Sequence, residues 1–410
     1  MKVLAYTSPA RGHLYPLVPI LIELGARGHE VAVRTLPAGV DTVRALGCKA
    51  EAIDPRIEAI QHDDFTAKTP VGSVKRSSAV FLARADFEVD DLRAAIAAEM
   101  PDVLLVDINC WGAVAVAEKS GLPWATVLPY PAPFPGDGIP PFGPGLAPAR
   151  GAAGRLRDRL LAPVVFGSVE RAIKPALNKV RDKVGVPRAA NVREMFSTAP
   201  LTIYLTAEPF EYRRADWPAS YRLVGPLSFD PPAATPEWLG DIDKPIVLVT
   251  TSSEFQDDGK LITAALDGMR DEDMFVLATL RAGDPAAFDV PANAHVERWV
   301  PHSVVVSRAV CVVTHGGMGA TQKALAAGVP VVAVPFGRDQ HEVARRVEAS
   351  GVGIRLPSSK LSPARLRDAV HQGRNRHDAA QRLARDLASA GGAARAADEI
   401  EALLAGPQQP

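Results

Sequence analysis

The sequence predicts an α/β protein built from two doubly wound parallel-sheet domains that face each other across a cleft. Short β-branched apolar runs alternate with helical patterns along the whole chain, which is typical of parallel strands connected by covering helices. The chain has 410 residues, 47% of them apolar, and this is enough to bury two separate cores. We expect the first domain over residues 1–216, a linker over residues 217–245 and the second domain over residues 246–377.

The first domain is expected to open with a strand, a tight loop and a helix. Residues 3–7 form a buried apolar run, residues 8–12 a short loop, and residues 14–27 an amphipathic helix that Gly28 ends. Further strands are expected at residues 31–35, 50–53, 103–106, 125–128 and 202–205, and helices at residues 86–99 and 112–119.

Two stretches dense in proline interrupt this alternation. Residues 131–154 are rich in Pro and Gly, which excludes a helix or a central strand. Long loops in compact domains are often lids or binding loops, and the alternative is a plain surface loop. A helix is expected at residues 155–184, and the second proline-rich stretch, residues 217–245, is the expected linker.

The alternation of strands and helices restarts after the linker. The tail from residue 362 is rich in Ala and Arg and is expected to be helical, with a break at Gly391 and Gly392. Before it, strands are expected at residues 246–250, 275–279, 311–314 and 331–334, and helices at residues 260–269, 319–327 and 340–350.

A glycine-rich turn in the second domain is the expected site for a phosphate group. A buried apolar strand ends directly before His315, Gly316, Gly317 and Gly319, which lead into a helix. In open α/β sheets, ligands bind at the carboxyl ends of the strands. Free N–H groups at a helix start attract phosphate, and glycines let the backbone approach closely. We therefore expect this helix start, which includes Ala320, to bind an anion, with His315 donating to it.

Two neighbouring segments are expected to complete this site. Asp339 and Gln340 follow the end of the next strand, and side by side they can hydrogen-bond several hydroxyls of one sugar. Upstream, Trp299 lies on a predicted loop and can stack on a flat base, while Val300 can offer backbone groups to the edge of that base. The alternative for Trp299 is a core aromatic residue.

This block resembles the donor-binding signature of the GT-B family-one glycosyltransferases, especially the actinobacterial enzymes that decorate natural products. The shared pattern is a Trp-x-Pro segment, then His-Gly-Gly, Gly-Val-Pro and Asp-Gln, and a downstream Gly-x-Gly. The resemblance implies the GT-B architecture, with a nucleotide-sugar donor bound by the second domain and an acceptor bound by the first. It implies that Trp299 stacks on the nucleobase, that the His-Gly-Gly segment holds the diphosphate, and that Asp339 and Gln340 hold the donor sugar.

The resemblance carries three further implications for the second domain. Ser252 and Ser253 match a loop that approaches the donor phosphates, and residues 378–410 match helices that cross back to the first domain. Many family members place a Glu eight residues after the His, where it binds the ribose hydroxyls. Here that position is Lys323, which donates only and cannot accept from two hydroxyls. We therefore expect a dTDP-deoxysugar donor, whose ribose lacks the 2′-hydroxyl of a UDP donor.

His13 is the candidate general base, and Asp107 is its expected partner. His13 follows Gly12 at the start of a helix, and Asp107 ends a later strand that should reach the same sheet edge. A helix start disfavours the imidazolium ion, so we expect a neutral His13 whose tautomer is fixed by a carboxylate. The family resemblance implies the same pair. The alternatives are a capping or hinge role for His13 and an N-cap role for Asp107.

The acceptor pocket is expected in the first domain, where aromatic residues accompany the loop of residues 131–154. Such a wall suits an apolar small molecule, for example a polyketide aglycone, and the expected reaction is an inverting sugar transfer to its hydroxyl. Two other functions remain open: a nucleotide-sugar epimerase, and an inactive protein that activates another transferase. The candidate acceptor residues are Gly12, Phe65, Phe81, Trp111, Phe134 and Phe142.

The composition narrows the range of partners. Lys and Arg number 46 and Asp and Glu 47, and this balance does not favour nucleic acid or an anionic membrane. The sequence shows no Cys/His metal spacing, so we expect no metal cofactor and three buried, reduced cysteines. It shows neither a signal-peptide pattern nor a membrane-span pattern, so a cytoplasmic protein is expected. A homodimer remains open.

Overall fold

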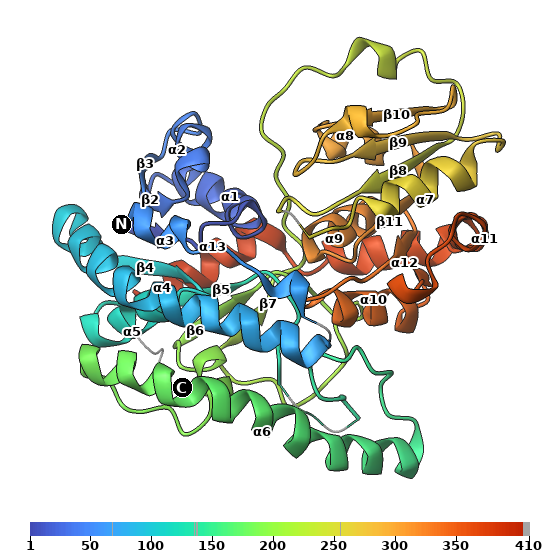
Figure 1. Cartoon of the computed structure of the whole chain (residues 1–410). Helices are drawn as coiled ribbons and strands as arrows, with labels where there is room; N and C mark the ends of the chain where they lie inside the picture. Colours follow the sequence, from blue (N-terminus) through green and yellow to red (C-terminus); the bar gives the residue numbers. More distant parts are fainter. Residues whose placement is uncertain (68, 135, 137, 255, 405–410) are drawn as a thin grey trace.

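The computed structural model describes residues 1–67, 69–134, 136, 138–254 and 256–404. It contains two α/β domains that face each other, with the N-terminal domain at the left of Figure 1 and the second domain at its upper right. This confirms the predicted fold class.

The first domain is built on a parallel sheet with the strand order β3-β2-β1-β4-β5-β6-β7. The chain runs outward from β1 in both directions, which places its helices on both faces of the sheet. The strands are β1 (Lys2–Tyr6), β2 (Glu30–Thr35), β3 (Lys49–Ala52), β4 (Val103–Asp107), β5 (Trp124–Leu128), β6 (Leu201–Tyr204) and β7 (Tyr221–Leu223). The helices are α1 (Arg11–Ala26), α2 (Pro37–Arg44), α3 (Pro55–Ala59), α4 (Pro70–Glu99), α5 (Trp111–Ser120) and α6 (Gly151–Val184).

The second domain repeats this architecture with the strand order β10-β9-β8-β11-β12-β13, again in parallel. Its strands are β8 (Ile246–Thr250), β9 (Phe275–Thr279), β10 (Ala294–Glu297), β11 (Ala309–Thr314), β12 (Val331–Ala333) and β13 (Gly353–Arg355). Its helices are α7 (Lys260–Met269), α8 (His302–Val306), α9 (Met318–Ala326), α10 (Gln340–Ala349), α11 (Pro363–Arg374) and α12 (His377–Ala388), and the chain continues into α13 (Gly392–Ala402).

Each sheet is buried on both faces, which explains why its strands read as continuous apolar runs. In the first domain, α4, α5 and α6 pack on one face, and α1, α2 and α13 pack on the other. In the second domain, α9, α10 and α12 cover one face, and α7 and α11 cover the other. Cys48, Cys110 and Cys311 are buried free thiols within these layers, as expected.

The strand register brings the carboxyl ends of neighbouring strands to one edge of each sheet. In the first sheet Tyr6 pairs with Val106, so the loop after β1 lies beside the end of β4. In the second sheet Thr250 at the end of β8 pairs with both Thr279 and Thr314. These two edges face the space between the domains, and they position the site described below.

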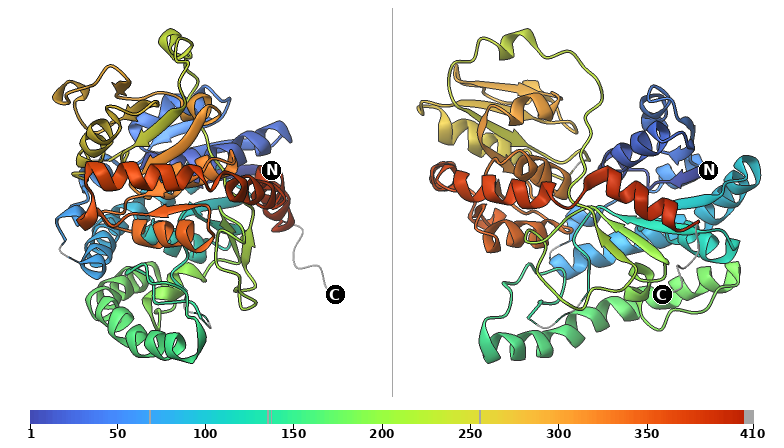
Figure 2. Two further views of the ribbon diagram at one scale, coloured as in Figure 1. Left: turned by 90° about the vertical axis from the view of Figure 1, so that its right-hand side faces the viewer. Right: turned by 180° about the vertical axis from the view of Figure 1, so that it is seen from behind.

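The last helix returns to the first domain. Helix α12 packs against α9 in the second domain, whereas α13 packs against α1 (Figure 2). Arg27 of the first domain donates to Asp398 at 2.6 Å and to Glu401 at 2.9 Å. The crossing therefore takes place after the break at Gly391, and residues 405–410 lie outside the described residues.

The observed elements differ from the expected ones where strands are short or prolines are frequent. Strand β7 lies inside the stretch expected as the linker and pairs with β6, because residues 219–225 contain no proline and can join the sheet. Strands β10 and β13 were not expected from the sequence, and α4 begins at Pro70, well before the expected residue 86. Within the described residues, no helix is long and apolar enough to cross a membrane.

Candidate active site

A cavity of about 420 Å³ lies between the two domains, and both sheet edges open into it. The first domain contributes the loop after β1 and the start of α1. The second domain contributes the loop after β8 and the starts of α9 and α10. The expected site residues that line the cavity are Gly12, His13, Phe81, Trp111, Phe142, Ser252, Ser253, Trp299, His315, Gly317, Gly319, Ala320, Asp339 and Gln340.

The expected contact between His13 and Asp107 is present. Nδ1 of His13 lies 2.6 Å from Oδ2 of Asp107, and Asp107 is buried behind the ring. The other oxygen of Asp107 accepts the backbone N–H of Asn109 at 2.8 Å, which holds the carboxylate in place. Asp107 therefore fixes Nδ1 as the protonated nitrogen of a neutral ring, and Nε2 is left toward the cavity.

Three carboxylates act on the pKa of His13. Burial lowers the pKa of His13, but the carboxylates of Asp107, Glu254 and Asp339 raise it, and the net direction is upward. This direction is opposite to the one expected from the start of α1, and the neutral state of the ring stays a prediction.

The start of α9 has the geometry of an anion site. Gly317 precedes the helix, and no side chain of the described residues caps its first N–H groups. A Cβ atom on Gly317 would lie 2.4 Å from Nε2 of His315, so a larger residue here would force this ring to shift. A Cβ atom on Gly319 would meet nothing within 4 Å, and the open space there belongs to the cavity. Unpartnered N–H groups at a helix start that opens into a cavity favour a bound phosphate.

Asp339 and Gln340, at the start of α10, differ in what their side chains contact. Asp339 lines the cavity, and burial raises the pKa of its carboxyl group. The amide of Gln340 is engaged within the protein: Oε1 accepts the N–H groups of Phe336 and Gly337, and Nε2 donates to Gln256. Gln340 thus orders the loop that carries Asp339.

The loop after β8 is held by its own side chains. The backbone N–H of Ser252 donates to Asp258 at 2.7 Å, and the hydroxyl of Ser252 accepts from Gln256 at 2.9 Å. Ser253 is exposed beside it and also lines the cavity. The loop therefore presents hydroxyl groups to the side of the cavity that contains His315.

An ion pair is formed by two residues that line the cavity, Lys323 and Asp230. Nζ of Lys323 lies 2.5 Å from Oδ1 of Asp230, and Oδ2 of Asp230 accepts the N–H of Ser303 at 2.8 Å. Burial raises the pKa of Asp230, but Lys323 outweighs this and holds the pKa below its ordinary value. Both oxygens of the carboxylate are thus already engaged by protein donors.

Four expected contacts lie outside the cavity lining. Phe65 is 40% exposed on a turn before α4, and Phe134 packs edge-on against Tyr221 at a ring distance of 5.2 Å. Val300 is buried in the core of the second domain, and Gly316 packs against the backbone of Gln340. Phe65 and Phe134 thus do not line the cavity, and their role as acceptor contacts stays a prediction. An aromatic side chain on a loop has no periodicity from which its direction can be predicted.

The acceptor side of the cavity is nevertheless strongly apolar. Phe142, from the loop of residues 131–154, lines it, and so does Phe81 from α4. Phe81 packs edge-on between His62 and Trp111, at ring distances of 5.7 and 5.6 Å. Burial lowers the pKa of His62 to about 4, so this imidazole is neutral and adds no charge to the wall. Other apolar lining residues are Val71, Val74, Val165, Phe166, Val169 and Phe196.

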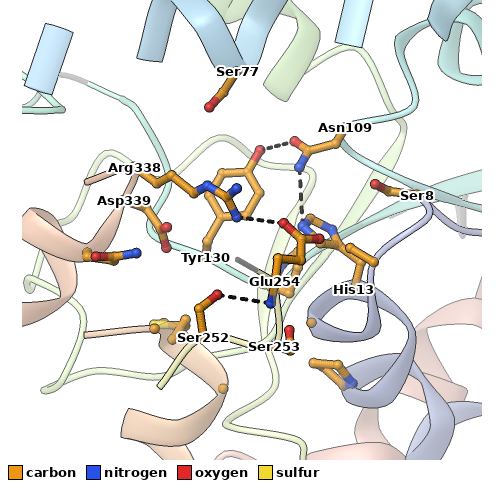
Figure 3. A pocket seen from close by; sticks show the side chains of 18 of the residues that line it. Ser8, His13, Ser77, Asn109, Tyr130, Ser252, Ser253, Glu254, Arg338 and Asp339 are labelled. Carbon is orange, nitrogen blue, oxygen red and sulfur yellow. Dashed lines mark hydrogen bonds and ion pairs between the residues drawn. The ribbon is translucent and has the colours of Figure 1, made fainter. Parts of the chain in front are cut away.

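Two residues beside His13 were missed from the sequence. Asn109 lies 3.3 Å from Nε2 of His13, and the hydroxyl of Tyr130 donates to Asn109 (Figure 3). Asn109 follows β4 by two positions and Tyr130 follows β5 by two positions. Their place at the carboxyl edge of the sheet was the signal that could have identified them.

Arg338 and Glu254 were also missed, because their role depends on the meeting of the domains. Arg338, directly before Asp339, donates to Glu254 at 2.8 Å and to Asp64 of the first domain at 2.9 Å. Its backbone N–H donates to Ser73 of α4 at 3.1 Å. These contacts fasten the loop before α10 to the first domain at the rim of the cavity. Among the described residues, no group of three or more His, Cys, Asp or Glu side chains could hold a metal ion.

The chain is similar in sequence to known proteins of natural-product biosynthesis and to other glycosyltransferases. Residues 263–403 match the family described as Erythromycin biosynthesis protein CIII-like, C-terminal domain. The chain is 35% identical to 4'-demethylrebeccamycin synthase of Lentzea aerocolonigenes over 385 residues, which cover 90% of each protein. It is 26% identical to NDP-glycosyltransferase YjiC of Bacillus licheniformis, over 98% of this chain and 97% of that relative.

A solved structure shares the whole fold. CalG4, the calicheamicin glycosyltransferase, superposes with a TM-score of 0.76 at 25% identity, over 100% of this chain and 99% of its own. The relatives and this structure span both domains, and the similarity is therefore not confined to the donor-binding half. The chain belongs to the GT-B glycosyltransferases of natural-product biosynthesis, and it is an enzyme of that class.

Proposed function

We propose that this glycosyltransferase moves a deoxysugar from a dTDP donor to a hydroxyl group of an apolar aglycone, with inversion at the anomeric carbon. The observation that carries the proposal is the single cavity that both His13 and the start of α9 line, one from each domain. A base and an anion site that face one cavity support a direct displacement, in which nucleophile and leaving group lie on opposite sides of the reacting carbon.

The reaction proceeds in one step. Nε2 of His13 takes the proton of the acceptor hydroxyl, and the acceptor oxygen forms a bond to the anomeric carbon. The bond between that carbon and the diphosphate breaks, and its electron pair leaves with the diphosphate. The N–H groups at the start of α9 stabilise the charge that grows on the leaving group, while Asp107 stabilises the imidazolium ion.

The preference for dTDP rests on Lys323 and Asp230, which both line the cavity. Lys323 occupies the position of the family's ribose-binding Glu, and its ammonium group is engaged by Asp230. Each oxygen of Asp230 already accepts from a protein donor, which makes this carboxylate a poorer acceptor for a second ribose hydroxyl than a free one. A 2′-hydroxyl buried without a partner costs binding energy, which a deoxyribose avoids.

The acceptor class follows from the wall made by α4, α6 and the loop of residues 131–154. The apolar side chains there favour a ligand that is itself largely apolar, and its reactive hydroxyl must reach His13. Asp339 and the hydroxyl groups of Ser252 and Ser253 remain for the donor sugar and its phosphates.

Calorimetric titration with dTDP and with UDP tests the donor, and tighter binding of UDP would refute the dTDP assignment. The anomeric configuration of the product, determined by NMR, tests inversion. Donor hydrolysis with and without an aglycone separates transfer from the two other functions. An epimerase would convert the sugar without an acceptor, and an inactive activator would leave the donor intact under both conditions.

A further inference from the structure

A chain of side-chain hydrogen bonds runs through the candidate base and continues beyond it. Asp107 binds Nδ1 of His13 at 2.6 Å, and Nδ2 of Asn109 lies 3.3 Å from Nε2 of the same ring. Oδ1 of Asn109 accepts the hydroxyl of Tyr130 at 2.5 Å. Figure 3 shows Asn109 between the phenol and the imidazole. The nitrogen that must receive a proton in the reaction therefore already has a hydrogen-bond partner.

The direction of these bonds follows from the phenol. Burial, followed by the charges of Asp107 and Asp339, raises the pKa of Tyr130 well above its ordinary value, so the phenol keeps its proton. The phenol donates that proton to Oδ1 of Asn109, and Nδ2 is consequently turned toward His13. An amide nitrogen donates and cannot accept, so Nε2 of His13 must accept and carries a lone pair.

Three carboxylates near the ring act in the other direction. Asp107 faces it from the end of β4, Glu254 from the loop after β8 and Asp339 from the loop before α10, and each favours the imidazolium ion. Arg338, a cation, donates to Glu254 at 2.8 Å. An imidazolium ion has no lone pair and cannot act as a base, so a neighbour that favours the neutral ring has a function here.

We propose that Asn109, oriented by the hydroxyl of Tyr130, is a positioning residue that keeps Nε2 of His13 unprotonated and directed into the cavity. The inference rests on the proposed role of His13 as the base. It adds a hydrogen-bond donor on the side of the ring opposite Asp107: the carboxylate fixes the proton on Nδ1, and the amide fixes the lone pair on Nε2.

The test is a pH titration of the His13 ring by 15N NMR in histidine-labelled protein, with the signal assigned by its loss in His13→Ala. In Tyr130→Phe the amide of Asn109 is free to turn, and Oδ1 can accept from a protonated Nε2. The pKa of His13 is expected to rise by about half to one unit, the size of one hydrogen bond. Because the titration needs neither donor nor acceptor, it can fail while sugar transfer is still observed, and the reverse also holds.

Tyr212→Phe is the matched control. The hydroxyl of Tyr212 is buried without a hydrogen-bond partner among the residues that the structure describes, and its ring lies under Arg346, outside the cavity. Its removal is expected to leave the His13 titration unchanged. A His13 titration in Tyr130→Phe that coincides with the parent overturns the proposal.

Asn109→Asp provides a second measurement should Tyr130→Phe fail to fold. This change replaces the donor at Nε2 by an acceptor of nearly the same shape, and the resting ring should then be protonated on both nitrogens. A rise in the pKa of His13 of at least about one unit, with both ring nitrogens protonated at neutral pH, supports the proposal. A ring that keeps its unprotonated Nε2 at neutral pH contradicts it.

Discussion

Nδ1 of His13 lies 2.6 Å from Oδ2 of Asp107, although 94 positions separate the two residues in the chain. The parallel pairing of β1 with β4 accounts for this contact, because it brings the loop after β1 beside the last residue of β4. The backbone N–H of Asn109 then fixes the carboxylate from the other side. The dyad is thus positioned by the sheet and does not depend on the closing of the two domains.

His13→Ala is expected to abolish most of the transfer activity without affecting the donor site. Removal of a general base lowers kcat by about 10²- to 10⁴-fold. The proposed donor site lies on the second domain, so the Kd for dTDP should be unchanged in isothermal titration. Near-normal turnover of a hydroxyl acceptor by this variant would show that His13 is not the base, whereas loss of dTDP binding would show a wider structural effect.

Gly145→Ala is expected to destabilise the contact between the loop of residues 131–154 and α10. The N–H groups of Gly143 and Gly145 both donate to Oε1 of Glu342, at 2.8 and 2.9 Å. Gly145 has φ +61°, and a Cβ atom there would lie 2.4 Å from the carbonyl oxygen of His341. The substitution adds this collision to a backbone strain of roughly 1–2 kcal/mol. Thermal unfolding measures the resulting loss of stability.

Gly138→Ala is the matched control for this loop. Gly138 also has a positive φ, +75°, but a Cβ atom there would meet only one atom, at 4.0 Å. The loss of stability in Gly138→Ala should therefore be limited to backbone strain. Equal losses of stability in the two variants would contradict the role given to the contact between Gly145 and α10.

The sequence was sufficient to predict the site residues whose position depends on a single sheet. Apolar runs identified most strands, and the rule that parallel strands share a carboxyl edge predicted the meeting of His13 with Asp107. The same rule predicted that the glycine turn after β11 lies at the carboxyl edge of the second sheet. These predictions rest on the apolar pattern of single strands and on the order of strands and helices, and both can be recognised in short segments of the sequence.

The remaining site residues depend on contacts between distant segments. Arg338 meets Asp64 only because the domains close on each other, and no spacing in the sequence indicates this pair. Phe134 turns into a cluster with Tyr221, a residue of the short strand β7 that was itself missed. The pKa of His13 likewise reflects Glu254 and Asp339 from the other domain, which a reading of α1 alone could not include.

The ion pair between Lys323 and Asp230 is expected to contribute measurably to stability. The two side chains are only 15% and 12% exposed, and Asp230 lies on the segment that joins the domains. A double-mutant cycle with Lys323→Ala and Asp230→Ala should give a coupling energy of about 0.5–3 kcal/mol, because each single change leaves the other charge partly buried. Chemical denaturation of the four proteins provides the measurement.

Lys183 and Asp86 form the matched control pair, with a similar distance of 2.8 Å but side chains that are 49% and 60% exposed. Solvent screens this pair, so its cycle should give a coupling at or below about 1 kcal/mol. A coupling for Lys323 and Asp230 no larger than that of the control would show that their burial has no energetic consequence.

Glu88 is expected to make the protein less stable as the pH rises. The side chain is buried beneath the start of α5, where Oε2 accepts the N–H of Gly112 at 2.9 Å. Burial raises the pKa of Glu88 from its ordinary value of 4.5 to about 8. Between these values the folded protein holds a proton that the unfolded chain has released, so stability falls as the pH rises from about 4.5 to about 8 and then levels off.

Glu88→Gln tests this dependence on pH. The variant keeps an oxygen that can accept from Gly112 and cannot ionise, so its advantage in melting temperature over the parent should be larger at pH 8 than at pH 5. Each unit of pKa shift corresponds to about 1.4 kcal/mol of stability. If the difference in melting temperature between Glu88→Gln and the parent is the same at pH 5 and at pH 8, Glu88 ionises normally in the folded state.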